Sequence, residues 1–258
     1  MKRLKNQTAV AIINIVYPLI TIAAVLCAWA IAAAALNKPL ILPSIGETLK
    51  GLGELMSQSV FYVQVGYTLL RLAVGYIISF VLAITAAICA AVCKPVKKLL
   101  SPLAAISRAI PTMSVILLCL LWVSNKILPV VVSVIIICPL LYTNILGAIE
   151  GVDSKLIEMS KVYSVPLAKR IKELYIPLTM PDILTSVRST LGLSLKLMIA
   201  GEVMSNTAYS IGQAMNMSNM YLETAQLFAW TIVAIILAAL LEGAVIAARR
   251  LALRWKYA

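Results

Sequence analysis

The sequence predicts an all-α, polytopic membrane protein with about six transmembrane helices. Of its 258 residues, 62% are hydrophobic and 12% are charged, whereas about 25% are charged in a typical soluble domain. The apolar residues occur in long uncharged runs, and a helix needs about 20 residues to cross the hydrocarbon core. None of the runs alternates with the period of two expected for an outer-membrane barrel. These observations exclude a soluble enzyme, a disordered chain and a DNA-binding domain.

Each long apolar run is interpreted as one span of a single transmembrane domain, residues 1–258. The first run, residues 6–37, follows a basic stretch but exceeds the roughly 7–15 residues of a signal-peptide core, so we expect it to remain in the mature protein. The fifth span is apolar except for Arg188, Lys196 and Glu202. The expected spans cover about residues 10–36, 66–92, 102–124, 127–149, 182–204 and 224–247.

The distribution of Lys and Arg predicts that both termini are cytoplasmic. With the N-terminus inside and six spans, fifteen of the 22 cations fall in cytoplasmic segments, and three fall in outer loops. This asymmetry is the positive-inside bias of membrane proteins. The net charge of +12 is therefore interpreted as topology and contact with lipid headgroups, and we expect no nucleic-acid partner.

The connection between the fourth and fifth spans, residues 150–177, is more structured than a simple connector needs to be. Asp153 or Ser154 is expected to cap a short helix. Pro166 is expected to end it, because proline disfavours a helical conformation in the residue before it. Pattern alone leaves two interpretations open: a docking element for a cytoplasmic partner, or an amphipathic helix lying on lipid headgroups.

A second short, basic helix is expected over residues 167–175. Pro177 and Pro181 are expected to break it from the fifth span, because proline interrupts a helix. One arc of the helix before Pro166 is apolar. The residues on that arc are Leu156, Ile157, Met159, Ser160 and Tyr163.

The same connection resembles the EAA loop of importer-type ABC transporter permeases, whose motif is Glu-Ala-Ala, three residues, Gly, nine residues, Ile, any residue, Leu-Pro. The spacing matches throughout. The corresponding residues are Glu158-Met159-Ser160, Ser164 and Leu174-Tyr175-Ile176-Pro177. Because Ser164 replaces the family's glycine, a tight turn there must form without the conformational freedom of glycine.

Other segments resemble one branch of that family, the permeases of nitrate, sulfonate, taurine and thiamine-precursor importers. The resemblance covers about residues 40–255. The segments are Ile41-Leu42-Pro43-Ser44, Tyr67 to Arg71 with Gly75, Arg108 to Pro111 at a turn inside the third span, Leu191 to Leu193, Ala200 to Glu202, Ser210 to Gly212 and Leu227 to Trp230.

This resemblance implies a type I ABC importer-like fold in the bacterial inner or plasma membrane. It implies half of a homodimeric channel that works with two cytoplasmic ATPase subunits and an extracellular or periplasmic substrate-binding protein. The coupling helix that contacts the ATPase would comprise Asp153, Leu156, Ile157, Glu158, Met159, Ser160, Tyr163, Ser164, Val165 and Pro166. The expected cargo is a small organic anion or heterocycle.

The chain itself is expected to be neither an enzyme nor a cofactor-binding protein. It has no Gly-x4-Gly-Lys-Ser/Thr phosphate loop and no histidine to act as a general base near neutral pH. Its five cysteines have no metal-ligand spacing, so we interpret them as packing residues. ATP and Mg²⁺ would therefore bind to the partner ATPase.

Ionisable groups inside spans are costly, and they normally face a pore or a partner. Lys196, near the middle of the fifth span, is the leading candidate to meet an anionic substrate, although a snorkelling side chain or a salt bridge would also explain it. Glu202 could line the pathway or serve structure or gating, with Arg71 paired to it or to headgroups. Met113 and Met198 are weaker pathway candidates, because methionine is more often a packing residue. Arg188 is expected to be an interfacial anchor.

The main alternative is a secondary transporter that is not coupled to an ATPase. Such a protein would need ion-coupling chemistry in the membrane and often contains an inverted repeat, and the sequence has no repeat of that kind. A vitamin-type importer component is expected to have paired small-residue-Arg motifs, which are absent. A membrane enzyme would need a cluster of His, Cys or carboxylates, and none is found.

Overall fold

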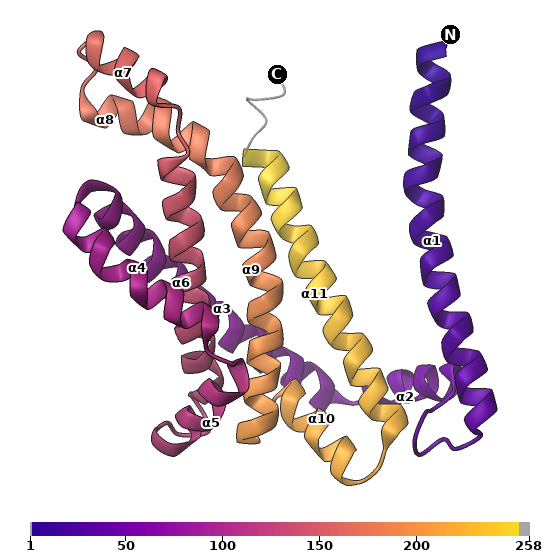
Figure 1. Ribbon diagram of the computed structural model, residues 1–258. Helices are drawn as coiled ribbons and strands as arrows, with labels where there is room; N and C mark the ends of the chain where they lie inside the picture. Colours follow the sequence, from indigo (N-terminus) through magenta and orange to yellow (C-terminus); the bar gives the residue numbers. More distant parts are fainter. Residues whose placement is uncertain (1, 253–258) are drawn as a thin grey trace.

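The computed structural model describes residues 2–252, which form helices joined by short connections (Figure 1). In chain order the helices are α1 (Lys2–Leu36), α2 (Ile45–Ser57), α3 (Ser59–Val92), α4 (Lys94–Ala109), α5 (Thr112–Trp122), α6 (Leu128–Glu150), α7 (Ser154–Val162), α8 (Leu167–Arg170), the π-helical turn η1 (Ile171–Tyr175), α9 (Ile176–Ser205), α10 (Ile211–Met220) and α11 (Thr224–Ala252).

Within this part of the chain, five helical segments are long and apolar enough to cross a membrane, or six with a bent pair. The five are Val16–Leu36, Ser59–Val92, Leu128–Glu150, Leu167–Ser205 and Thr224–Leu251. The bent pair is α4 and α5, whose axes meet at 102°. Residues 102–124 therefore do not form a single straight span. The corner lies at Ile110 and Pro111, both in extended conformation, because proline disfavours a helical residue before it.

The predicted break at Pro177 and Pro181 is wrong, because the helix continues from Leu167 to Ser205. The π-helical turn explains how it passes Pro177: the N–H of Ile176 donates to the carbonyl of Ile171, five residues back, which shifts the hydrogen-bond register ahead of the proline. Pro181 lies inside α9. Threonine hydroxyls donate to nearby carbonyls there, from Thr179 to Tyr175 and from Thr185 to Pro181, both at 2.8 Å, which compensates for bonds that proline weakens.

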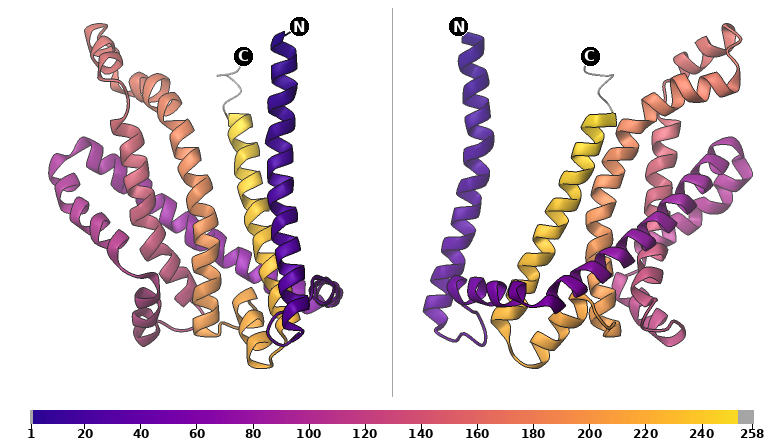
Figure 2. Two further views of the ribbon diagram at one scale, coloured as in Figure 1. Left: turned by 45° about the vertical axis from the view of Figure 1, so that its right-hand side comes forward. Right: turned by 180° about the vertical axis from the view of Figure 1, so that it is seen from behind.

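The core of the bundle lies around α6, which packs between α3 and α9 (Figure 2). Ile137, Leu141 and Ile145 of α6 are fully buried. Facing them, α3 contributes a series of buried alanines, Ala83, Ala87 and Ala90. Small residues at such spacing let two helix backbones approach closely in a membrane, so α3 crosses α6 without a bulky layer between them.

Helix α1 stands apart from this bundle over most of its length (Figures 1 and 2). None of the window of highest hydropathy within Val16–Leu36 is buried. Among the side chains of α1 that the structure describes, from Val16 onward, Trp29 contacts the rest of the chain: its Nε1 donates to the carbonyl of Pro43 at 3.0 Å. The indole also packs against Phe228 of α11, with 5.5 Å between ring centroids.

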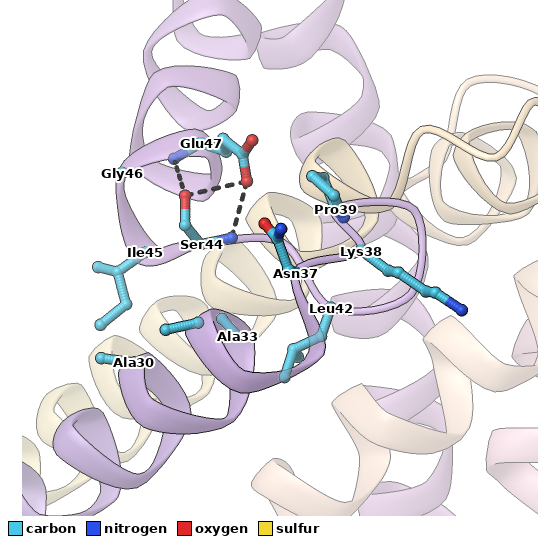
Figure 3. Close-up of a pocket in the computed structure, with 11 residues that line it drawn as sticks. Ala30, Ala33, Asn37, Lys38, Pro39, Leu42, Ser44, Ile45, Gly46 and Glu47 are labelled. Carbon is cyan, nitrogen blue, oxygen red and sulfur yellow. Dashed lines mark hydrogen bonds between the residues drawn. The ribbon is translucent and has the colours of Figure 1, made fainter.

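A cavity of about 430 Å³ lies where α1 turns into α2 (Figure 3). Its rim includes a capping box: the hydroxyl of Ser44 accepts from the N–H of Glu47, and the Glu47 carboxylate accepts from the Ser44 N–H at 2.8 Å. The hydrogen bonds from Ser44 lower the pKa of Glu47. The box fixes the start of α2, which runs roughly across the direction of α1 (Figure 2).

Candidate functional site

Helix α7 begins and ends as the sequence predicts, with a defined cap at each end. Asp153 is the N-cap, and its Oδ1 accepts from the N–H of Lys155 at 2.9 Å. At the other end, the N–H of Val165 donates to the carbonyl of Ser160, and that of Ser164 donates to Lys161, both at 2.9 Å. This pair of bonds is a Schellman motif. It turns the chain sharply into Pro166 and α8, at one end of the molecule (Figure 1).

Ser164 occupies the position in this turn at which helices prefer glycine. Its φ angle is +52°, which is the left-handed conformation that costs an L-residue roughly 1–2 kcal/mol. The family motif has glycine at this position, and the backbone geometry gives the physical reason. Serine therefore forms the turn with some strain, while the Schellman hydrogen bonds hold it in place.

We predict that Ser164→Gly stabilises this turn and that Ser164→Val destabilises it. Glycine adopts positive φ at no steric cost, whereas a β-branched residue there is a genuine outlier. Hydrogen exchange of the amides of Ser160 to Val165 in the full-length protein should be slower in the glycine variant and faster in the valine variant. If both variants exchange like the wild type, backbone strain at this position is negligible.

The residues proposed for coupling divide into two groups in the structure. Ser160 is buried, and Leu156, Ile157 and Val165 are half-buried. These four side chains therefore lie on the covered side of the segment that contains α7. The exposed members are Asp153, Glu158, Met159, Tyr163, Ser164 and Pro166. The expected apolar arc thus has an inner half and an outer half.

An exposed apolar surface, the α7 patch, projects from this end of the molecule. It comprises Met159, Val162 and Tyr163 of α7 and Leu167 of α8, with Val162 80% and Tyr163 76% exposed. Val162 and Leu167 were not among the predicted residues, although their apolar character next to the motif was visible in the sequence. Apolar side chains gathered at a projecting tip indicate a protein-interaction surface.

Lys196 lies on a second feature, a groove of about 620 Å³ between α9 and α11. Its side chain is exposed to the groove, as the prediction of a pathway residue requires. The groove also contains Glu242 of α11, which accepts from Arg188 Nε and Nη2, each at 3.2 Å. Arg188 therefore forms an ion pair with α11, a contact that the expectation of an interfacial anchor did not include. The lining residues are Leu195, Lys196, Ile199, Ala200, Met215, Thr231, Ala234, Ile235, Ala238, Ala239 and Glu242.

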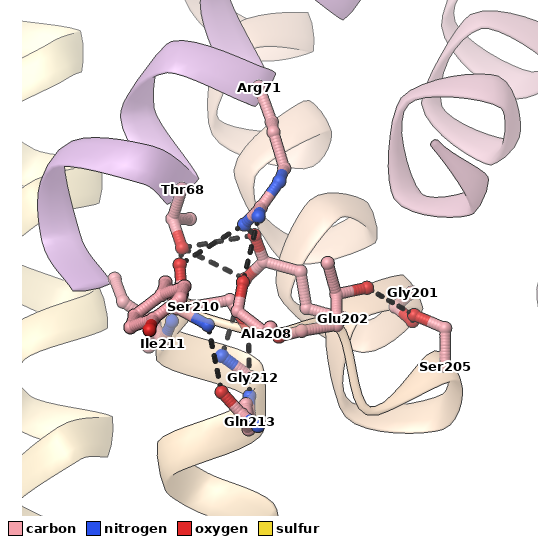
Figure 4. A network of polar contacts seen from close by, with 12 residues as sticks. Thr68, Arg71, Gly201, Glu202, Ser205, Ala208, Ser210, Ile211, Gly212 and Gln213 are labelled. Atoms are coloured by element: carbon pink, nitrogen blue, oxygen red, sulfur yellow. Dashed lines mark hydrogen bonds and ion pairs between the residues drawn. The ribbon is translucent and has the colours of Figure 1, made fainter. Parts of the chain in front are cut away.

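Glu202, near the C-terminal end of α9, is fully buried in a network of polar contacts (Figure 4). Its carboxylate accepts from the Thr68 hydroxyl at 3.0 Å, from Arg71 Nη1 at 3.2 Å and from the Gly212 N–H at 3.2 Å. Arg71 also donates to the carbonyl of Ala208 at 2.9 Å. Of the two partners left open for Arg71, the structure has Glu202. These contacts tie α3, α9 and the start of α10 together.

The two methionines predicted for the pathway lie in different surroundings. Met198 is fully buried, and its neighbours include Leu72 and Leu195. Met113, near the start of α5, is half exposed. The structure thus brings Lys196 to an accessible groove and places Met198 and Glu202 in the interior of the chain.

Residues 79–256 match the family described as the binding-protein-dependent transport system inner membrane component. The chain belongs to this family. It is therefore a multi-pass permease subunit of a binding-protein-dependent ABC importer. This assignment replaces the alternative of an uncoupled secondary transporter.

Individual relatives agree with the family. The chain is 23% identical over 220 residues to the putative aliphatic sulfonates transport permease protein SsuC of Bacillus subtilis, covering 84% of this chain and 78% of that protein. Its fold is similar to that of the inward-facing methionine ABC transporter MetNI, with a TM-score of 0.55, 14% identity and coverage of 78% and 94%. An amino acid ABC transporter crystallised with histidines gives a TM-score of 0.56 at 15% identity, covering 74% and 93%.

Proposed function

We propose that this permease forms, as a homodimer, the translocation pathway of an importer with two cytoplasmic ATPase subunits and an extracellular or periplasmic substrate-binding protein. ATP and Mg²⁺ bind to the ATPase subunits. Both termini of the permease face the cytoplasm. The cargo is a small organic anion of the sulfonate type rather than a neutral heterocycle.

The α7 patch is the observation on which this proposal rests. Met159, Val162 and Tyr163 are each more than half exposed and belong to none of the hydrophobic clusters of the described residues. Aromatic and methionine side chains are enriched at protein interfaces. The start of α1 and the end of α11 lie at the same end of the molecule as α7 (Figure 1). That end also carries the predicted cytoplasmic cations of α7, α8 and α11, which supports a cytoplasmic partner.

The proposed cycle uses α7 as a rigid lever. When ATP brings the two ATPase subunits together, the paired α7 helices move with them, and the two permease copies change from an inward-facing to an outward-facing arrangement. Hydrolysis reverses the movement. The Asp153 cap and the Schellman motif keep α7 rigid. A movement of the ATPase at the α7 patch therefore displaces α6 and α9 instead of deforming the turn after α7.

The choice of an anionic cargo rests on Lys196 and on the relative. A cation at an accessible groove within the spans favours an anion over a neutral heterocycle. The named sulfonate permease of Bacillus subtilis is a relative over most of its length. Sulfonates are therefore the first solutes to test.

Affinity purification of the permease from its native membrane tests the proposal, with Tyr163→Asp as the informative variant. We expect an ATPase subunit to co-purify in stoichiometric amount with the wild type and to be lost with Tyr163→Asp. Tyr221→Asp is the matched control, because Tyr221 is 72% exposed but follows α10 at the opposite end. A permease that is reproducibly solitary in mild detergent would contradict the proposal.

A further inference from the structure

One face of α9 carries a cation, a glycine and a second cation at successive helical turns. Arg188, Gly192 and Lys196 are spaced four residues apart, so their positions lie above one another, about 6 Å apart along the axis. This face of α9 is turned toward α11, because Arg188 pairs with Glu242 and Lys196 lines the groove between the two helices.

Glu242 occupies the space that Gly192 leaves open. Its Oε2 accepts from Arg188, while its Oε1 lies 3.2 Å from the position that a Cβ on Gly192 would take. Any side chain at Gly192 would crowd this carboxylate. Glu242 is thus held beside the middle turn of the face, with Arg188 about one turn away on one side and Lys196 about one turn away on the other.

The charges on this face do not balance. Two cations and one carboxylate leave a net charge of +1, and Arg188 already binds the carboxylate. Among the described residues, Lys196 takes part in no ion pair. The rest of the groove wall is almost entirely aliphatic. A lysine on an apolar wall within the spans is costly unless it meets an anion.

We propose that this groove recognises a singly charged oxyanion that carries an apolar group, such as an alkyl sulfonate. Lys196 pairs with the oxyanion, such as the sulfonate group, and the aliphatic side chains of the groove contact the apolar group of the ligand. Arg188 is a positioning residue: by binding Glu242 it keeps the carboxylate from neutralising Lys196. Gly192 allows this arrangement by giving Glu242 room. This inference rests on the proposed function, because it assigns the recognition site of the same transport pathway.

The arrangement makes a specific prediction about charge. Removing Arg188 frees Glu242 to pair with Lys196, so Arg188→Ala should impair recognition of the anion although Arg188 itself does not bind it. Removing the Glu242 charge as well should release Lys196 again. The double variant Arg188→Ala/Glu242→Gln is therefore expected to be more active than the single variant Arg188→Ala, a non-additive result that plain structural damage would not give.

The test uses the complete importer, purified with its ATPase and binding protein and reconstituted in vesicles, with radiolabelled butanesulfonate as the probe. We expect Lys196→Gln and Arg188→Ala each to lower the rate of ATP-dependent uptake about tenfold or more, and Lys196→Arg to keep most of it. Arg188→Ala/Glu242→Gln should recover at least about half of the wild-type rate. The matched control is Lys98→Gln, which removes an exposed cation outside the groove.

Two readings in the same experiment separate the inference from the proposed function. If the wild-type complex shows no binding-protein-stimulated ATP hydrolysis and no uptake, the proposed function fails. If hydrolysis is stimulated but Lys196→Gln takes up butanesulfonate at the wild-type rate, or the double variant stays as slow as Arg188→Ala, the inference is overturned. The inference is also overturned if Lys196→Gln lowers uptake in vesicles that contain anionic lipid but not in vesicles of phosphatidylcholine alone, because the groove would then bind anionic lipid.

Discussion

Glu158→Lys is expected to abolish uptake while the permease still inserts and assembles in the membrane. Glu158 is exposed, and it is the only acidic residue of α7, which also carries Lys155 and Lys161. Reversing its charge leaves the helix uniformly basic at the proposed ATPase interface. We expect Glu158 to face a cation of the ATPase, so that the variant places like charges opposite each other at a cost of several kcal/mol. About 3 kcal/mol already weakens binding more than 100-fold. Uptake by whole cells and the amount of permease in the membrane fraction measure the two halves of this prediction.

Glu173→Lys is the matched control for this experiment. It makes the same charge change on an exposed side chain of the neighbouring π-helical turn, where Glu173 lies 4.0 Å from Lys169. Exposed ion pairs of this kind contribute little to stability, so uptake should remain close to that of the wild type. Normal uptake in the Glu158→Lys variant, at equal expression, would remove α7 from the coupling mechanism.

Gly212→Ala is expected to lower the stability of the solubilised permease markedly. A Cβ at this position would overlap the Cβ of Glu202 and lie 2.6 Å from the backbone nitrogen of Val203. The first turn of α10 would have to move, which would lengthen the hydrogen bond from the Gly212 N–H to the buried Glu202 carboxylate. Overpacking costs about 1–3 kcal/mol, and a weakened bond to a buried charge adds about 1–3 kcal/mol. Thermal unfolding in detergent measures the loss.

Gly53→Ala is expected to raise the stability of the permease, although it is also a change from glycine to alanine. Gly53 lies inside α2, and nothing lies within 4 Å of the position that a Cβ would take there. Alanine is favoured over glycine in a helix by about 0.5–1 kcal/mol, so this variant should unfold at a slightly higher temperature. If both variants shift the transition alike, the close approach of α10 to α9 is not a constraint.

The transmembrane helices were predictable because an uncharged apolar run that is long enough to cross the membrane identifies a span without knowledge of its neighbours. The runs that became α3, α6 and α11 needed no tertiary information. The proline positions were harder, because the effect of a missing N–H depends on how the helix compensates for it. Pro111 produces a corner, whereas Pro177 and Pro181 lie within a continuous helix that adapts through a π-helical turn and threonine hydroxyls.

The coupling element was predictable in its caps but not in its surface. Asp153 and Pro166 act locally, so their neighbours in the sequence were sufficient to place the ends of α7. Which side of α7 is covered depends on how the chain folds back into α8 after the turn at Ser164 (Figure 1). As a result, the buried Ser160 and the exposed Tyr163 were assigned to a single arc.

The polar contacts inside the bundle could be anticipated only in part. Glu202 had two open roles, because its partner Arg71 is separated from it by 131 residues. The pair of Arg188 and Glu242 was missed. A signal for it was present, since Glu242 is the only acidic residue in the expected span 224–247, and an ionisable group in a span needs a partner.

The Glu202 network can form only after α9 has been synthesised, although Thr68 and Arg71 of α3 are made much earlier. Thr68 and Arg71 leave the ribosome more than 130 residues before the carboxylate that binds them, and at about 5–20 residues per second this interval is on the order of ten seconds. Until then, the arginine of α3 has no internal counter-charge from Glu202. A nascent chain arrested before α9 therefore keeps Arg71 of α3 without the buried carboxylate that binds it in the complete chain.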